Sequence, residues 1–363
     1  MENRPENQRL DYIDSVRGIA ALAVVAYHWI GHVTVSAYPL WGETTSRLLQ
    51  SLFNGPGAVA IFFVISGLVL SLRYIQQPDK PIAYREFIVK RLFRLYPAYW
   101  VALAVMFLYM HRDFTFHVFE ELLKLLTEAS LIRDYSPLYG AGWTLNVEMA
   151  ASLLMPVFIL VLRHDRQWFF ILILLSVLLN RFYMPYVFHF LLGMWIALYF
   201  DRIQAGHHRS HWAYRWRYAL LLPAFFCFSG GILLGDMSQH KSWQLFLTVS
   251  AFDWQQLMAI PSALLLVWII GSPRWQRWLS AESLVFLGKI SYGVYLMHWW
   301  AVLQWLGPHI DWFRIGLGMG DAAAWAVEGL CALALTILTA TLLHYGVEIP
   351  MIRKGRKMGK KWG

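Results

Sequence analysis

The sequence predicts an all-α integral membrane protein, a bundle of about ten transmembrane helices with both termini in the cytoplasm. Of the 363 residues, 58% are hydrophobic and 15% are charged, whereas a soluble domain is about 45–50% apolar and about 25% charged. The apolar residues gather in stretches long enough to span a bilayer. Lysine and arginine concentrate between these stretches, with a strong bias to one side of the membrane.

A spanning helix needs about 20 mostly apolar residues. The fifth candidate is short and the sixth follows it at once, which predicts a tight hairpin. An amphipathic piece over 116–131 is expected to lie along the outer interface, and 241–256 either begins the eighth helix or lies in the interface. The ten candidates are 16–34, 57–75, 95–111, 143–162, 168–180, 183–200, 218–235, 247–270, 285–305 and 323–346.

The distribution of basic residues supports ten spans. With the N-terminus in the cytoplasm, 22 of the 31 lysines and arginines fall in inside segments and seven in outside loops, as the positive-inside rule requires. The net charge of +9 therefore indicates membrane orientation, and no nucleic-acid partner is expected. We expect a single membrane domain over 1–363, with the transmembrane bundle at about 10–350 and a basic cytoplasmic tail at 351–363. Cys227 and Cys331 are expected to be buried packing residues.

The first apolar stretch carries two ionisable residues on one face. Arg17 and His28 are eleven residues apart, which is about three helical turns and about 16 Å along the axis. Arg17, at the cytoplasmic end, either anchors the helix at the interface or contributes to a site. His28 lies past the bilayer centre, where an ionisable group favours a functional role over packing. His32 follows four residues later, but the segment lacks the glutamate of the zinc-protease motif, so no metal is expected.

A second group of cations precedes the third predicted helix at its cytoplasmic end. Lys90, Arg91 and Arg94 share a helix face, since residues three and four apart are neighbours. They are either the positive-inside signal itself or a cradle for the phosphates of an anionic cofactor, because cations near a helix N-terminus suit phosphate.

The fourth predicted helix carries a carboxylate inside the membrane. Glu148 lies about one and a half turns from Trp143, at the outer end. A carboxylate there is costly unless it is paired, protonated or hydrated. Glu148 therefore either forms a structural salt bridge or belongs to a site. At the depth of His28 it could fix the tautomer of the imidazole.

The ninth predicted helix brings a further histidine to mid or outer depth. His298 either packs or belongs to the same site, and Tyr292 and Tyr295 lie within two turns of it. Other polar residues in apolar surroundings are expected to be packing residues, namely His189, His344 and Glu348.

Several motifs in order resemble acyltransferase family 3, a family of integral membrane proteins. The resemblance runs from about residue 10 to 350, and Thr144 stands where a serine is commoner in the family. Its motifs are Asp14-Ser-Val-Arg17 with ten residues to His28, Phe62-Phe-Val-Ile-Ser-Gly67, Arg91-Leu-Phe-Arg94-Leu-Tyr-Pro97, Trp143-Thr-Leu-Asn-Val-Glu148, Phe190-Leu-Leu-Gly193 and Ile290-Ser-Tyr-Gly-Val-Tyr-Leu-Met-His298.

The resemblance implies transfer of an acyl group, most often acetyl, from cytoplasmic acyl-coenzyme A to a hydroxyl of a glycan or glycolipid, such as lipopolysaccharide or exopolysaccharide. It places the chain in the plasma (bacterial inner) membrane. The donor is then a substrate reached from the cytoplasm, and its pantetheine arm can cover the distance from Arg17 to His28. The implied roles are His28 as base and Glu148 as its orienting partner, donor binding by Arg17, Lys90, Arg91 and Arg94, and acceptor binding by Trp143, Asn146, Tyr292 and His298.

Two alternatives remain at this point. A multispan transporter or exporter of a glycan or small molecule would use His28 and Glu148 to line a path or relay protons. Within the acyltransferase reading, a covalent acyl-histidine is the alternative to direct transfer.

Overall fold

The computed structural model describes residues 10–36, 43–110, 118–131, 139–179, 186–205, 258–306 and 312–361. These residues form helices and short connections, with no strand among them, which confirms the all-α class. In chain order the elements are α1 (Asp11–Ser36), α2 (Glu43–Leu52), α3 (Gly55–Gln76), α4 (Tyr84–Met110), α5 (Val118–Ala129), α6 (Gly142–His164), α7 (Arg166–Leu179), α8 (Val187–Leu198), α9 (Phe200–Ala205), α14 (Ala259–Ile270), α15 (Pro273–Leu279), α16 (Glu282–His298), the π-helical η2 (Trp299–Leu306) and η4 (Trp312–Gly316), α17 (Asp321–Leu343), π-helical η5 (His344–Glu348) and α18 (Ile349–Gly359).

Within this part of the chain, five helices are long and apolar enough to cross a membrane. They are Asp11–Gly31, Leu48–Gln76, Tyr84–Met110, Gly142–His164 and Asp321–Gly359. Three shorter apolar helices, within α7, α8 and α14, accompany them. Eight of the ten expected stretches coincide with described helices, 247–270 does so in its second half, and 218–235 lies outside the described residues. The number ten and the orientation stay predictions.

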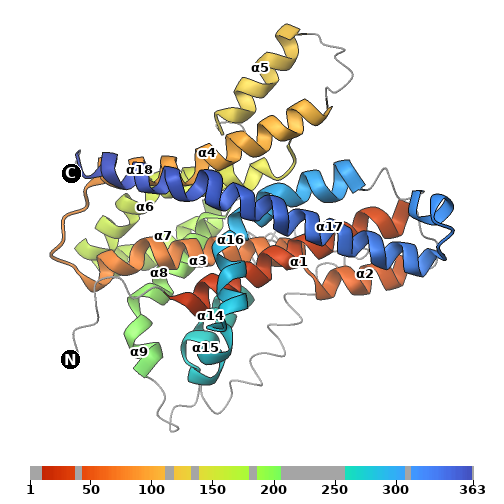
Figure 1. Cartoon of the computed structure of the whole chain (residues 1–363). Helices are drawn as coiled ribbons and strands as arrows, with labels where there is room; N and C mark the ends of the chain where they lie inside the picture. Colours follow the sequence, from red (N-terminus) through yellow and green to blue (C-terminus); the bar gives the residue numbers. More distant parts are fainter. Residues whose placement is uncertain are drawn as a thin grey trace.

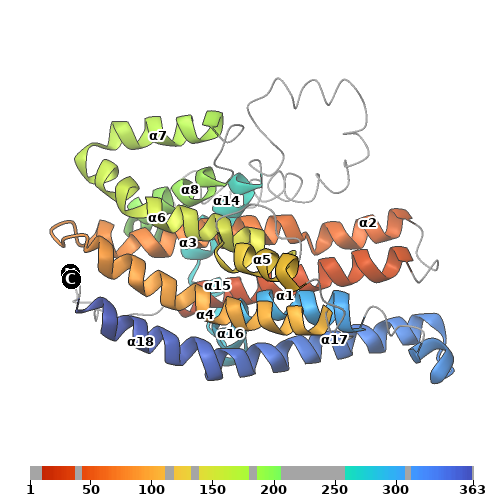
Figure 2. The same cartoon turned by 90° about the horizontal axis from the view of Figure 1, so that it is seen from above.

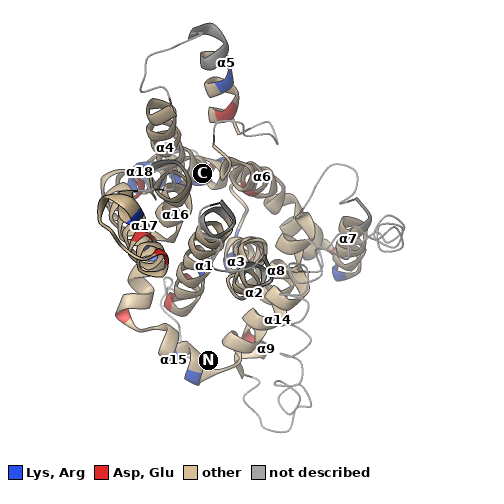
Figure 3. Ribbon diagram, turned by 90° about the vertical axis from the view of Figure 1, so that its right-hand side faces the viewer, with Lys and Arg blue, Asp and Glu red and all other residues tan. Residues whose placement is uncertain are grey.

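The helices form a bundle around α1 and α3. Seen end-on, these two lie at the centre, with α16 and α17 on one side and α8 and α14 on the other (Figure 3). The view from above places α7 at the edge opposite α17 and α18 (Figure 2). The amphipathic stretch forms α5, which extends away from the bundle (Figure 1). The central helix α1 carries Arg17 and His28, and the other residues expected to act lie on α4, α6 and α16.

Close packing of α1 against α16 depends on two glycines. A Cβ at Gly18 would meet the backbone of Leu287 and Gly288, and one at Gly288 would meet the backbone of Asp14 and Ser15. Small residues permit such close approach between membrane helices, where packing rather than hydrophobic burial drives association. Gly18 and Gly288 differ by 270 in number, as do His28 and His298, so α1 and α16 run parallel in constant register over about 15 Å.

The cationic cluster lies inside a helix, where the sequence placed it before one. α4 begins at Tyr84, so Lys90, Arg91 and Arg94 lie two to three turns from its start. The expectation that these cations precede the helix was therefore wrong, while their role in binding phosphates stays a prediction. Charged residues lowered the apolarity of the first turns and hid their helical continuation, and Pro97 lies within the same helix. These cations project from the side of α4.

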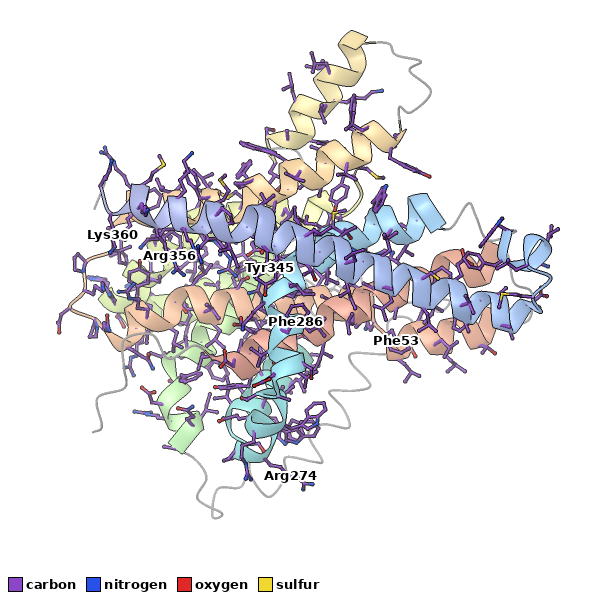
Figure 4. The ribbon with its side chains drawn as sticks, viewed as in Figure 1. Phe53, Arg274, Phe286, Tyr345, Arg356 and Lys360 are labelled. Carbon is purple, nitrogen blue, oxygen red and sulfur yellow. The ribbon has the colours of Figure 1, made fainter. Side chains whose placement is uncertain are left out.

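The basic C-terminal residues form a helix where a tail was expected. α17, η5 and α18 are continuous over 39 residues, about 58 Å, which exceeds the roughly 30 Å of bilayer hydrocarbon. Gly355 and Gly359 are buried, the first against Phe93 of α4 and the second near Glu86. Arg356 and Lys360 are exposed on this helix, at the end of the molecule where α4 begins (Figure 4).

Cys331 is exposed on α17, so the expectation of burial was wrong for it, and Cys227 lies outside the described residues. The same helix exposes Leu330, Leu338 and Leu342. An apolar exposed face on a membrane-spanning helix is suited to lipid. Cys331 therefore shares the outward face of α17.

Candidate active site

A cavity of about 150 Å³ lies where five helices meet. α1 contributes Tyr27 and His28, and α16 contributes Tyr295. The remaining walls come from the starts of three helices, with Gly55 and Pro56 from α3, Trp143 from α6, and Tyr186 and His189 from the start of α8. A helix N-terminus carries a partial positive charge. The cavity therefore joins an imidazole to the positive ends of three helix dipoles.

His28 is half-buried at this cavity and is surrounded by rings. The centroid of its imidazole lies 5.3 Å from that of His298, 5.2 Å from that of Trp299 and 5.3 Å from that of Tyr27. The constant register of α1 and α16 brings His28 and His298 together. Sequence spacing on each helix gave their depth, and the packing of the two glycines supplies their contact.

Tyr295 connects three parts of the site. Its hydroxyl accepts a hydrogen bond from the Thr144 hydroxyl at 2.9 Å, and its backbone carbonyl lies 2.6 Å from Nδ1 of His298. Tyr139 donates to the next carbonyl of the helix, that of Leu296. These bonds fix α16 against the start of α6. Thr144, which departs from the family's commoner serine, keeps the hydroxyl that this contact needs.

The residues expected to bind the acceptor separate in the structure. Trp143 lines the cavity and lies 5.3 Å, ring to ring, from Tyr186. Asn146 instead donates to the carbonyl of Leu131 at 2.9 Å, and the hydroxyl of Tyr292 donates to the carbonyl of Leu95 at 2.7 Å. Asn146 and Tyr292 thus hold backbone segments, and His298 lies beside His28, outside the residues that line the cavity.

Glu148 lies among the cations. Its Oε1 is 2.6 Å from Arg91 and accepts a hydrogen bond from Ser66 at 3.3 Å. Nε of Arg91 donates to the Ser152 hydroxyl at 3.0 Å. The charges of Arg17 and Arg94 also act on the Glu148 carboxylate. Arg91 is 7% exposed, so its guanidinium is buried in this ion pair.

Two other cations expected to bind the donor, Arg17 and Lys90, differ in how closely they pair with a carboxylate. Arg17 lies 3.9 Å from Asp14, which is too long for a hydrogen bond. Lys90 forms an ion pair with Glu86 one turn earlier on α4. Arg17 therefore carries a charge that its carboxylate neighbour does not bind closely. The cluster and the cavity occupy different levels of the bundle, and α1 runs between them.

The sequence analysis did not identify Tyr27, Tyr186 or His189 as residues of a site, although all three line the cavity. Tyr186 stands outside every motif, and His189 was expected to be a packing residue. Tyr186 and His189 belong to the start of α8, which packs closely against α3: a Cβ at Gly67 would meet the Phe190 backbone, and one at Gly193 the Val64 carbonyl. The motif Phe190-Leu-Leu-Gly193 was the available signal, because its glycine marks close packing that positions His189.

His344 and Glu348 are buried on η5, where Nδ1 of His344 lies 2.8 Å from Oε2 of Glu348. Their role as packing residues stays a prediction. No group of three metal-ligating side chains occurs among the described residues.

Comparison with known proteins gives a consistent result. Residues 10–345 match the family described as an acyltransferase domain. A putative acetyltransferase of Acidianus two-tailed virus, ORF330, is 27% identical over 335 residues, covering 87% of this chain and 88% of that protein. The exopolysaccharide production protein ExoZ of Rhizobium meliloti (strain 1021) is 25% identical over 331 residues, covering 83% and 91%. Nodulation protein 10 of Rhizobium leguminosarum bv. viciae is 30% identical over 179 residues, covering 43% and 45%.

No solved structure matches the chain significantly. The family match spans nearly the whole chain, including α1, α4, α6 and α16. These comparisons therefore support an acyltransferase over a transporter without acyl transfer. The chain belongs to acyltransferase family 3 and is an acyltransferase.

Proposed function

We propose that this protein transfers an acyl group, most often acetyl, from cytoplasmic acyl-coenzyme A to a hydroxyl of a glycan or glycolipid, at the plasma (bacterial inner) membrane. One observation carries the proposal. A cationic cluster containing Arg17 and a cavity lined by His28 lie about 16 Å apart along one helix, which an extended pantetheine arm covers. The names of the relatives, an acetyltransferase and an exopolysaccharide production protein, support both the acyl group and the acceptor.

The donor nucleotide is proposed to lie at the cations. Arg17 and Arg94 offer guanidinium groups that match phosphate oxygens bidentately. Arg91 is paired with Glu148, and Lys90 with Glu86. When the donor binds, each cation either attracts the phosphates from within its ion pair or leaves its carboxylate to bind them. In this account Glu148 organises the donor end of the site, and its effect on His28 runs through the donor's position.

The chemistry is proposed to be direct transfer at His28. The imidazole takes the proton of the acceptor hydroxyl as the oxygen attacks the thioester carbonyl. The ester C–O bond forms, the C–S bond breaks, and the leaving sulfur takes the proton from His28. The carbonyl oxygen becomes negative on the way, and the helix N-termini at Gly55, Trp143 and Tyr186 offer their positive ends to that charge.

The size of the cavity favours a short acyl group. A volume of about 150 Å³ is small beside the roughly 300–1,000 Å³ of typical ligand pockets. This space accommodates an acetyl group and the edge of a sugar ring that bears the reacting hydroxyl. Trp143, Tyr186 and Tyr27 supply the flat apolar faces that sugar rings stack on.

Purified protein in detergent, given acetyl-coenzyme A and an oligosaccharide acceptor, is expected to release free coenzyme A and form an O-acetyl ester on the oligosaccharide. Arg17→Ala should raise the KM for the donor and leave the KM for the acceptor unchanged, because the guanidinium contacts only the nucleotide end. Arg17→Lys should recover only part of the loss, since ammonium cannot bind bidentately. The measurement is ester formation by mass spectrometry together with coenzyme A titration.

Arg166→Ala provides the control. It removes the same positive charge, but Arg166 is exposed at the start of α7 and lies outside the cationic cluster. Absence of any ester with several oligosaccharides and acyl donors would contradict the proposed function. An equal affinity for coenzyme A in the wild type and Arg17→Ala would remove Arg17 from the donor site.

A further inference from the structure

His298 presents a buried acceptor atom that the fold leaves unused. Its side chain is 1% exposed, and Nε2 has no hydrogen-bond partner among the described residues. The other ring nitrogen, Nδ1, lies 2.6 Å from the backbone carbonyl of Tyr295. A buried polar atom without a partner is rare in native proteins and requires an explanation.

The contact with Tyr295 decides the tautomer of His298. A carbonyl oxygen accepts hydrogen bonds and cannot donate them, so Nδ1 of His298 carries the proton and donates it. In neutral imidazole the second nitrogen then carries no proton, and its lone pair can accept a hydrogen bond. Nε2 of His298 is therefore held as an acceptor by its own helix, before any substrate arrives.

The imidazole of His28 lies beside that of His298. The two ring centroids are 5.3 Å apart with an interplanar angle of 29°, close enough for a small ring rotation to bring two nitrogens within hydrogen-bond distance. Gly18 and Gly288 lock the parallel register of α1 and α16, so this juxtaposition is part of the packing of the bundle. His28 lines the cavity and His298 does not.

We propose that His298 is a positioning residue whose Nε2 accepts a hydrogen bond from His28 when His28 takes the proton of the acceptor hydroxyl. This inference rests on the proposed function. When the O–H bond breaks, His28 becomes an imidazolium with two N–H donors. One faces the reacting atoms and later returns its proton to the leaving sulfur; the other is received by Nε2 of His298. The positive charge that forms on His28 is thereby stabilised where it forms.

A merely structural histidine would not need this arrangement. Packing requires the volume of the ring and the bond from Nδ1 to Tyr295, and both leave Nε2 unsatisfied at a cost. An acceptor whose hydrogen bond from His28 strengthens when His28 becomes positively charged favours the transition state over the ground state. The cost in the resting protein is consistent with a functional group held ready.

Two amide substitutions separate these roles. In His298→Asn the amide nitrogen replaces Nδ1 and can still donate to Tyr295, while no atom replaces Nε2. In His298→Gln the amide oxygen can occupy the place of Nε2 and accept a hydrogen bond, but it cannot take a proton. We expect His298→Asn to lower kcat by about 10–100-fold, the loss that corresponds to one hydrogen bond to a charged group, with donor and acceptor KM unchanged, and His298→Gln to restore most of kcat.

His164→Asn, an exposed histidine at the end of α6, provides the matched control and should keep the wild-type kcat. If His298→Asn keeps the wild-type kcat, or if His298→Asn and His298→Gln lose the same amount, the positioning role is overturned. If the wild type transfers acyl groups and His28→Ala does not, either of these two results for the His298 variants disproves this inference and leaves the proposed function standing. If the wild type transfers none, the proposed function fails first.

Discussion

Replacement of His28 by alanine is expected to lower kcat for acyl transfer by about 10²–10⁴-fold, the usual loss for a positioned general base. The KM for acyl-coenzyme A should stay the same, because the cations that bind the nucleotide lie about 16 Å away along α1. Thermal stability should change little, since His28 is half-buried at the edge of a cavity. Steady-state kinetics and a thermal-unfolding assay on the same preparation measure both.

His28→Gln tests whether the loss is chemical or geometric. Glutamine keeps polarity and approximate size but cannot take a proton, so it should be as inactive as alanine. His164→Ala, at an exposed position, should be fully active. A folded His28→Ala protein with wild-type kcat would remove the base from the mechanism.

Replacement of Glu148 by alanine is expected to reduce stability more than any other single change at the site. The substitution leaves the buried guanidinium of Arg91 without its carboxylate, and removing one partner of a buried pair typically costs about 3–5 kcal/mol. A lower midpoint of thermal unfolding in detergent should report it. Glu148→Gln, which keeps an acceptor without the charge, should lie between alanine and the wild type.

The double variant Arg91→Leu with Glu148→Leu separates stability from function. A buried ion pair can often be replaced by apolar residues without loss of stability, so the unfolding midpoint should return toward the wild type. Donor affinity should remain weak, because the cluster has lost a cation. A Glu148→Ala protein as stable as the wild type would show that this ion pair does not stabilise the bundle. Wild-type donor affinity in the double variant would remove Arg91 from the donor site.

The sequence predicts helices and their contents better than their contacts. Apolar stretches identify most of the described helices, because the membrane requires internally hydrogen-bonded segments of defined length. The same criterion predicts a helix that begins at residue 95, whereas α4 begins at Tyr84. Lys90, Arg91 and Arg94 interrupt the apolar pattern, but the helix continues through them. The criterion also predicts a tail in place of α18, because Ile349–Gly359 is short and rich in basic residues and so does not resemble a spanning stretch.

Site residues were found where one helix carries the information. Arg17 and His28 share a face of α1 by helical geometry alone, and Trp143 lies at the start of α6. Glu148 was identified as ionisable and buried, but its partner on α4 depends on how α4 and α6 pack. The sequence of one helix predicts the depth of a residue in the membrane and the helix face on which it lies. The residue that it contacts depends on how two helices pack. For the same reason the spacing of His298 gives its depth, whereas its contact with His28 requires the glycine-mediated register of α1 and α16.

The most direct test of the account is transfer across a sealed membrane. The protein is reconstituted into liposomes with the oligosaccharide acceptor either sealed in the lumen or added outside, and labelled acetyl-coenzyme A is supplied outside only. If donor and acceptor enter from opposite faces and meet near His28, label should appear on the lumenal acceptor alone, even when the protein inserts in both orientations, and His28→Ala should abolish it. Labelling of the external acceptor without the lumenal one would contradict transfer through the bundle.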